Sequence, residues 1–104
     1  MARMVVIYRK PADPVEFEKH YFGVHVPLAK QLPGLRKYEV STGPVLRIAG
    51  SFDPYLIVTL LFDTLEAIKS AFATELGRAC AADRRSMAPG DEDVQIFLFD
   101  DREI

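Results

Sequence analysis

The run Tyr55–Phe62 constrains the fold more than any other part of the chain. Its sequence, YLIVTLLF, is apolar almost without interruption, which is typical of a central strand that is covered on both faces. Met4–Tyr8 and Val94–Phe99 have the same two-sided apolar character and the length of strands. Three strands of this kind need a packed layer on each side of the sheet that they form.

The segment between the first two predicted strands indicates a helix with an internal irregularity. Asp13 suits the N-cap of this helix and Pro14 suits its first position. Farther along, Gly23 weakens a helix, and Pro27 would clash with the carbonyl four residues before it. We therefore expect a break or kink near residues 23–26, followed by a short second helix over residues 27–32 and the Pro-Gly turn at 33–34.

The next segment predicts a strand, a loop and the central strand already described. Leu35–Thr42 follows the Pro-Gly turn and has the composition of a strand. Residues 43–54, with two glycines and two prolines, predict a loop with room for a short extra strand at 45–48. A loop of this length between two strands is a candidate rim for a pocket.

A second helical segment follows the central strand. Asp63 and Glu66 have the spacing of a capping box, so we expect the helix to begin after Asp63. The helical pattern continues toward Met87, with Gly77 as the candidate position for a division.

The order of these elements predicts an α+β fold of the ferredoxin-like βαββαβ type. In this fold both helical segments lie on one face of a four-stranded antiparallel sheet. A chain of 104 residues is expected to form a single domain over residues 1–104. Because three strands are apolar on both sides, the sheet face without helices would be exposed and apolar. We expect a homodimer in which two such sheet faces pack together.

His25 is the functional candidate that the helical pattern singles out. It lies on a stripe whose members are spaced four, four, three and four apart: Phe17, Tyr21, His25, Leu28 and Leu32. An ionisable group on an apolar face needs a partner or a purpose. Two interpretations stay open, a core histidine that is satisfied by a backbone carbonyl and a polar group at the floor of a ligand pocket.

The second histidine, His20, falls off this stripe and is expected nearer water. Its five-residue spacing from His25 does not place both on one face of an α-helix, so we expect no metal site on the pair. Tyr38, on the second strand, has a hydroxyl that could bind a ligand, and a purely structural role for it is the alternative.

Composition narrows the range of partners. A net charge of -2 and a pI of about 5.6 give no basic surface for nucleic acid, so none is expected as a partner. The apolar run near the N-terminus is too short for a signal peptide or a membrane span, and no membrane partner is expected. The single cysteine, Cys80, fits a reducing compartment and an inert buried thiol. We expect a cytoplasmic protein.

Three segments give the chain a resemblance to the EthD family. These are the His-x-Pro-Leu motif at 25–28 with Leu-Pro-Gly-Leu at 32–35 and Tyr38, the motif Phe-Asp-x-x-Glu-Ala at 62–67, and Ala-Ala-Asp at 81–83. The resemblance implies a dimeric α+β barrel, a homodimer without a cofactor, and a cavity between helices and sheet in each subunit. The family takes its name from an ether-degradation operon. Residues 84–87, Arg-Arg-Ser-Met, depart from the Pro-Asn-Phe-like continuation of relatives, in a stretch that could help close the pocket.

Three functions follow from the residues and the resemblance. The first is a cofactor-free enzyme acting on a small apolar, aromatic, polyketide-like or lactone compound, with His25 as general acid or base. Tyr21 or Tyr38 would then orient the substrate or stabilise an oxyanion, with Tyr38 as the second catalytic candidate. The second is a non-catalytic protein that binds a small apolar molecule, as an accessory of a degradation pathway. The third is a structural domain with His25 in its core. Ligand contacts are predicted for Tyr8, Phe17, Tyr21 and Leu28.

Overall fold

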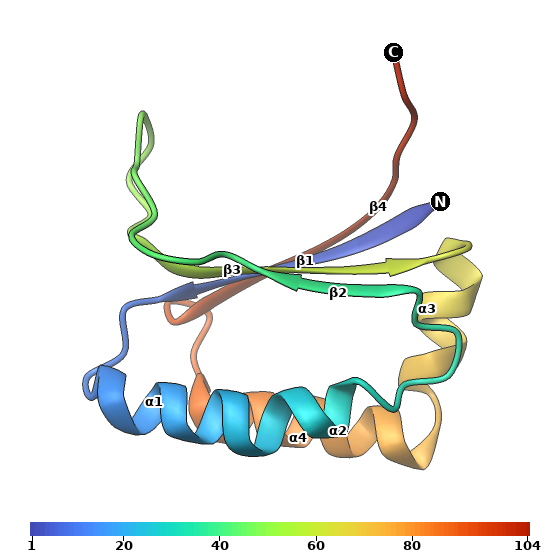
Figure 1. The fold of residues 1–104 in the computed structure, drawn as a ribbon, viewed down its shortest axis with the longest axis horizontal. Coiled ribbons are helices and arrows are strands. Elements are labelled where there is room, and N and C mark those ends of the chain that lie inside the picture. The colour runs from blue at the N-terminus through green and yellow to red at the C-terminus, as the bar shows by residue number, and fades with distance from the viewer.

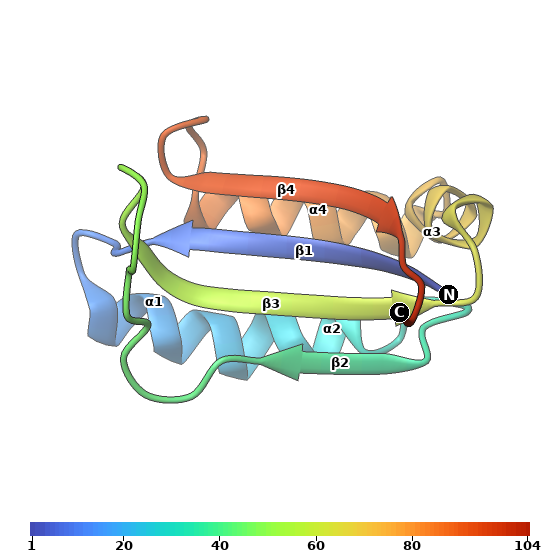
Figure 2. The same ribbon diagram turned by 90° about the horizontal axis from the view of Figure 1, so that it is seen from above.

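A computed structural model describes all 104 residues of the protein. Its elements are β1 (Ala2–Arg9), α1 (Pro14–His20), the π-helical turn η1 (Tyr21–His25), α2 (Val26–Ala29), β2 (Lys37–Val40), β3 (Pro54–Phe62), α3 (Leu65–Phe72), α4 (Glu75–Met87) and β4 (Val94–Asp100). The strands form one antiparallel sheet in the order β2-β3-β1-β4. The α1–α2 segment and α4 run beneath one face of this sheet, and α3 lies at its end (Figures 1 and 2). The predicted ferredoxin-like α+β fold is confirmed.

The two faces of the sheet differ because side chains alternate along each strand. Val6 pairs with Val58 and Tyr8 pairs with Leu56, and all four side chains are buried against the helices. The opposite face has no helix on it (Figure 1). Register places the following apolar side chains on that face: Val5, Ile7, Ile57, Leu61, Phe97 and Phe99.

The first helical segment stays helical through the predicted break. Asp13 is the N-cap, as expected, and its carboxylate accepts a hydrogen bond from the N–H of Glu16 at 3.1 Å. The irregularity is η1, in which the N–H of Val26 donates to the carbonyl of Tyr21, five residues earlier. Pro27 follows directly and has no N–H to donate, so the change from π to α pattern leaves no donor unpaired there. The prediction of an irregularity is confirmed, but its form is a widened turn.

The second helical segment does not begin where the sequence predicts. Thr64 is the N-cap of α3, and its Oγ1 accepts a hydrogen bond from the N–H of Ala67 at 3.0 Å. The expected cap, Asp63, instead binds Arg36 through two hydrogen bonds of 2.8 and 3.1 Å. The prediction for Asp63 is wrong because Arg36, on the chain before β2, draws its carboxylate away from the helix end.

The division of this segment also lies elsewhere than predicted. α3 ends at Phe72, and Thr74 caps α4 by accepting from the N–H of Gly77 at 3.0 Å. Gly77 is therefore inside the first turn of α4. A Cβ at this position would overlap the backbone of Ala71 and Phe72, so the glycine is needed for close contact between the two helices. No helix of the structure has the length and apolar character that crossing a bilayer requires.

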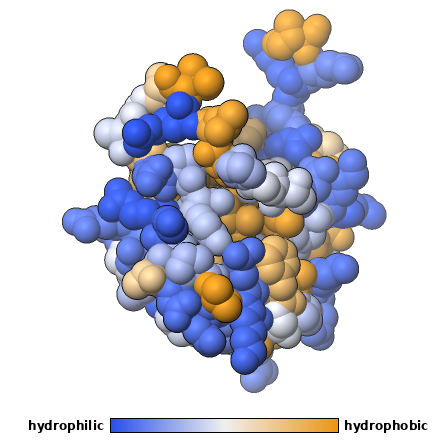
Figure 3. Space-filling model, turned by 60° about the vertical axis from the view of Figure 1, so that its left-hand side comes forward, coloured by the Kyte–Doolittle hydropathy of each residue, from blue (hydrophilic) through white to orange (hydrophobic).

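Two segments rise above the sheet face that carries no helix (Figure 1). One is the loop at 41–53, which contains no strand, so the extra strand expected at 45–48 is wrong. The other is the C-terminal tail after β4. Both carry apolar side chains at their surface (Figure 3), among them Ile48, which is 95% exposed, and Ile104.

Candidate functional site

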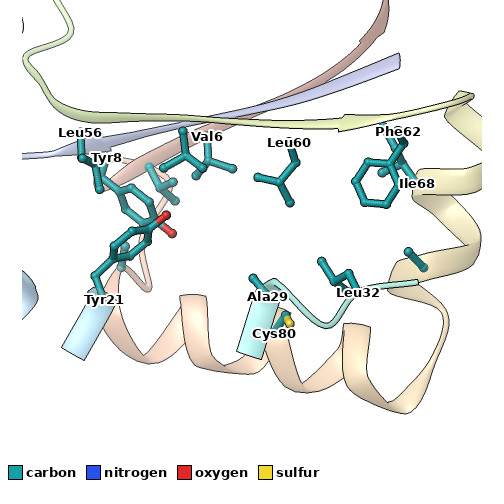
Figure 4. Packing of buried hydrophobic residues seen from close by; sticks show 14 of the residues in the cluster. Val6, Tyr8, Tyr21, Ala29, Leu32, Leu56, Leu60, Phe62, Ile68 and Cys80 are labelled. Carbon is teal, nitrogen blue, oxygen red and sulfur yellow. The ribbon is translucent and has the colours of Figure 1, made fainter. Parts of the chain in front are cut away.

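A cavity of about 110 Å³ lies between the sheet and the helical layer. Thirteen of the fifteen residues that line it are hydrophobic, and they come from all four strands as well as from the helices. Its hydrogen-bonding side chains are three tyrosines, one histidine and one arginine: Tyr8, Tyr21, Tyr38, His25 and Arg84. In Figure 4 the hydroxyls of Tyr8 and Tyr21 point toward one another, while Leu60 and Leu32 lie farther along the core. The cavity thus has a polar region and an apolar region.

His25 is buried, with 8% of its surface exposed, and belongs to the cavity wall. Its Nδ1 lies 2.8 Å from Oδ2 of Asp83, on α4. A carboxylate only accepts hydrogen bonds, so Nδ1 carries the proton and donates it. In the neutral ring, Nε2 then holds the lone pair and is the nitrogen left for a ligand. The partner of His25 is a carboxylate, not the backbone carbonyl that the sequence left open.

His20 binds the same carboxylate from the other side. Its Nε2 lies 2.8 Å from Oδ1 of Asp83, so both oxygens of Asp83 are engaged by imidazole rings. The expectation that the two histidines cannot share a side of the helix is wrong. The π turn between them has hydrogen bonds that span five residues, which is the spacing from His20 to His25. No group of three or more His, Cys, Asp and Glu side chains has an arrangement that could hold a metal ion.

Burial and hydrogen bonding set the charges of this cluster. Burial lowers the pKa of His25 below its ordinary value of 6.5, although the hydrogen bond to Asp83 opposes this shift. Burial would raise the pKa of Asp83, but the hydrogen bonds from His20 and His25 outweigh it and hold that pKa below its ordinary value. At neutral pH the cluster therefore contains an ionised carboxylate beside a neutral His25 ring.

The tyrosine hydroxyls are the second polar feature of the cavity. The hydroxyl oxygens of Tyr21 and Tyr38 are 2.6 Å apart, so one hydroxyl donates to the other. Burial raises the pKa of all three cavity tyrosines, Tyr8 included. These hydroxyls stay protonated at neutral pH and can donate hydrogen bonds to an acceptor in the cavity.

Of the four predicted ligand contacts, Tyr8 and Tyr21 line the cavity, whereas Phe17 and Leu28 do not. Phe17 stacks on Tyr21, with ring centroids 5.8 Å apart, and meets the edge of Tyr8 at 5.3 Å. It therefore holds the tyrosine rings in place.

Leu28 is partly buried against the core and is not a lining residue. Cys80 lines the cavity, and burial raises the pKa of its thiol.

Asp83 and Arg84 enter the sequence analysis only as parts of segments, Asp83 in the Ala-Ala-Asp motif and Arg84 in the stretch that could help close the pocket, and neither is named there as a site residue. A signal for Asp83 exists, since it lies on a helical stripe with Leu76, Cys80 and Met87 at spacings of four, three and four. An ionisable residue on an apolar stripe is the same signal that singles out His25. Arg84 carries no comparable signal, because an arginine in a run of charged residues is usually a solvated one.

An antiparallel four-stranded sheet with one helical layer, and a small cavity between the two, defines the ferredoxin-like class of α+β proteins. The profile of the EthD domain matches residues 9–90 of the chain. The chain belongs to the EthD family, as its sequence motifs predict.

Similar proteins are known from bacteria. A Rhodococcus erythropolis protein, described as an uncharacterized 11.0 kDa protein in the thcB-thcC intergenic region, is 33% identical over 104 residues, covering 99% of this chain and 96% of that protein. The crystal structure of an ethyl tert-butyl ether D (EthD) family protein from Bacillus halodurans C-125 is 26% identical with a TM-score of 0.86, covering 98% of this chain and 99% of that one. A dimeric ferredoxin-like protein of unknown function from Thermobifida fusca YX is 18% identical with a TM-score of 0.66, covering 94% and 88%, and this likeness concerns the fold alone.

Proposed function

We propose that the protein is an enzyme that transfers a proton to or from a small apolar or aromatic compound, with His25 as general acid or base. The observation that carries the proposal is the 2.8 Å hydrogen bond from His25 Nδ1 to Asp83, made by a residue of the cavity wall. This bond fixes the ring and leaves Nε2 for the substrate. Because burial lowers the pKa of His25, the ring is a neutral base at neutral pH.

The paired hydroxyls of Tyr21 and Tyr38 support the same chemistry. Removing a proton next to a carbonyl group puts negative charge on the carbonyl oxygen, and a preorganised hydroxyl stabilises that charge. One hydrogen of the pair stays free after the mutual hydrogen bond of 2.6 Å. Tyr38 is thus the second catalytic residue of the proposal.

The size of the cavity restricts the substrate to about one ring. Its volume of about 110 Å³ is near that of engineered apolar cavities of about 150 Å³, which bind benzene. Enolisable single-ring ketones and lactones fit this space and this chemistry better than multi-ring polyketides do. They are therefore the compounds with which the proposal is tested.

Hydrogen–deuterium exchange tests proton transfer without knowledge of the full reaction. A panel of single-ring ketones and lactones is incubated with the protein in D₂O, and loss of the acidic C–H signal is followed by proton NMR. We expect the wild type to accelerate exchange for members of the panel. His25→Asn keeps a donor near the position of Nδ1 but removes Nε2, so we expect it to lower the rate by about 10²–10⁴-fold.

Lys19→Gln is the control for this experiment, because Lys19 is exposed on α1 and does not line the cavity. It should exchange at the wild-type rate. Equal rates for the wild type and His25→Asn would contradict the role of His25.

A non-catalytic ligand-binding protein is the second candidate function. It is favoured by the thirteen hydrophobic residues among the fifteen that line the cavity. Such a protein would bind single-ring compounds, accelerate exchange for none of them, and keep its affinity in His25→Asn. Titration of the same panel by calorimetry separates the two functions.

We also propose that the protein works as a homodimer in which the uncovered sheet faces pack together. The apolar side chains on that face support this, with Phe97 53% exposed. The loop at 41–53 and the C-terminal tail rise on the same side (Figure 1) and would contact the second copy. The Thermobifida fusca relative is described as dimeric. Sedimentation should give about twice the 11.7 kDa mass of the chain.

A further inference from the structure

Arg84 brings a permanent positive charge to the wall of the cavity. Its side chain is half-buried and is one of the lining residues. It takes part in none of the ion pairs of the structure. Nη1 donates to the carbonyl of Ala88 at 2.9 Å, which uses one of the five N–H donors of a guanidinium. The remaining donors and the charge itself have no protein partner.

Tyr8 presents a second donor without a partner. Its side chain is 2% exposed, and its ring is held by edge contacts to Phe17 and Tyr21. The hydroxyl forms no hydrogen bond within the protein, unlike the hydroxyls of Tyr21 and Tyr38. Figure 4 shows it directed from β1 toward the helical layer, into the space near Tyr21. No fully buried side-chain polar atom of the structure lacks a hydrogen-bond partner, so the Tyr8 hydroxyl is open to the cavity, where a ligand or water can accept from it.

These two donors lie in the same region of the cavity. Arg84 is one helical turn beyond Cys80 on α4, toward the C-terminal end of that helix. Burial raises the pKa of Tyr8 while the charge of Arg84 acts against that rise, and the same charge helps to lower the pKa of His25 after burial. Arg84, Tyr8 and His25 all line the same cavity of about 110 Å³, so a single bound ligand can contact both donors.

The cavity has donors in excess and lacks a free acidic acceptor. No Asp or Glu is among the lining residues, and Asp83, the residue before Arg84, already binds an imidazole through each of its oxygens. A ligand that complements this wall brings negative charge and acceptor atoms to Arg84 and Tyr8. A carboxylate has the planar shape that accepts two hydrogen bonds from a guanidinium.

We propose that the cavity binds a single-ring compound that bears a carboxylate, with the carboxylate held by Arg84 and Tyr8. The ring would lie against the apolar part of the wall, which includes Leu32, Leu60 and Phe72. This assignment rests on the proposed function in that it uses the same cavity, and it names the substrate class. Arg84 is then the residue that determines specificity for acids over neutral compounds.

Benzoate and nitrobenzene test this proposal, since they have nearly the same shape and differ in charge. Their affinities are measured by calorimetry at neutral pH, where benzoate is ionised. We expect the wild type to bind benzoate at least about tenfold more tightly than nitrobenzene, and Arg84→Gln to lose that preference. Arg85→Gln makes the same change of charge on the exposed neighbouring residue and should keep the preference.

Tyr8→Phe is the second variant, because it removes only the hydroxyl and preserves the buried ring. It should weaken benzoate binding severalfold and leave nitrobenzene binding unchanged. Equal affinities of the wild type for the two compounds, or a benzoate preference that survives Arg84→Gln in a folded protein, would overturn the proposal.

The two proposals fail separately. Proton exchange on neutral ketones without a benzoate preference would overturn the carboxylate assignment and leave proton transfer by His25 in place. A benzoate preference without any exchange activity would support the carboxylate site and contradict the enzyme.

Discussion

Asp83 joins two imidazole rings that the sequence places five residues apart, and the orientation of His25 depends on it. In Asp83→Asn the side chain has one acceptor oxygen and two N–H donors, so it cannot accept from both rings. We expect proton exchange to fall by about 10²-fold or more, because His25 loses the bond that fixes its tautomer. NMR exchange rates measured together with thermal melts check this. An unchanged rate in a folded variant would contradict the positioning role.

The pKa of His25 predicts how stability depends on pH. Its pKa is lowered in the folded protein, so between that value and about 6.5 the unfolded chain binds more protons than the folded one. Stability is therefore lost as the pH falls below about 6.5. The lowered pKa of Asp83 adds a further loss only below its ordinary value of 3.8.

Urea titrations check this prediction at about pH 7.5 and about pH 5, a range that includes 6.5 and stays above the ordinary aspartate value of 3.8. The free energy of unfolding should be smaller at the lower pH for the wild type. His25→Asn should show less of this pH dependence. A wild type that gains stability on acidification would show that the ion pair with Asp83 outweighs the cost of burial.

At the scale of single elements, Thr64 and Asp63 form a matched pair for the start of α3. Thr64→Ala removes the N-cap hydrogen bond of 3.0 Å to the N–H of Ala67, so we expect a loss of about 1 kcal/mol in the free energy of unfolding. Asp63→Ala removes an exposed pairing with Arg36, which contributes little in water. Chemical denaturation measures both. A larger loss for Asp63→Ala would place the helix start one residue earlier.

Replacing Gly77 or Gly23 with alanine is expected to change the stability of the protein in opposite directions. Gly77→Ala brings a methyl group into the backbone of Ala71 and Phe72, so we expect it to destabilise the protein by about 1–3 kcal/mol. Gly23 is exposed in η1 and has open space where a Cβ would lie. Gly23→Ala should therefore stabilise the protein by about 0.5–1 kcal/mol, through the lower entropy of the unfolded chain. Differential scanning calorimetry should show melting temperatures that move in opposite directions.

At the scale of the whole molecule, a charged substitution on the uncovered sheet face tests whether the protein forms a dimer through that face. Phe97→Asp puts a carboxylate into the proposed dimer interface, and we expect it to convert the dimer to a monomer because an unpaired buried charge is costly. Val15→Asp makes the same kind of change on exposed α1 and should leave the dimer intact. Sedimentation of the two variants at equal concentration checks this. A wild type that sediments as a monomer would contradict the proposed assembly.

The sequence predicts the fold well because the pattern that specifies it is local. Tyr55–Phe62 and Val94–Phe99 are recognisable as strands from their own residues, and their order leaves few topologies. The site is harder to predict, because it depends on contacts between distant segments. His25 is found from its stripe, but its partner Asp83 is 58 residues away, and the pairing of both histidines depends on a π turn that an α-helical wheel does not represent. Asp63 shows the same limit, since Arg36 draws it from the cap that local spacing predicts.

The π turn also determines which changes of chain length this protein can tolerate. Because such a turn contains one residue more than an α turn, deletion of a single residue from 21–25 would let the helix close as an ordinary α-helix. Every later residue of that helix would then rotate by about 100° relative to the residues before it. Either the two histidines would separate from their shared carboxylate, or Leu32 would leave the core. We expect homologous chains to show no single-residue gaps in this segment, while the loop at 41–53 varies in length.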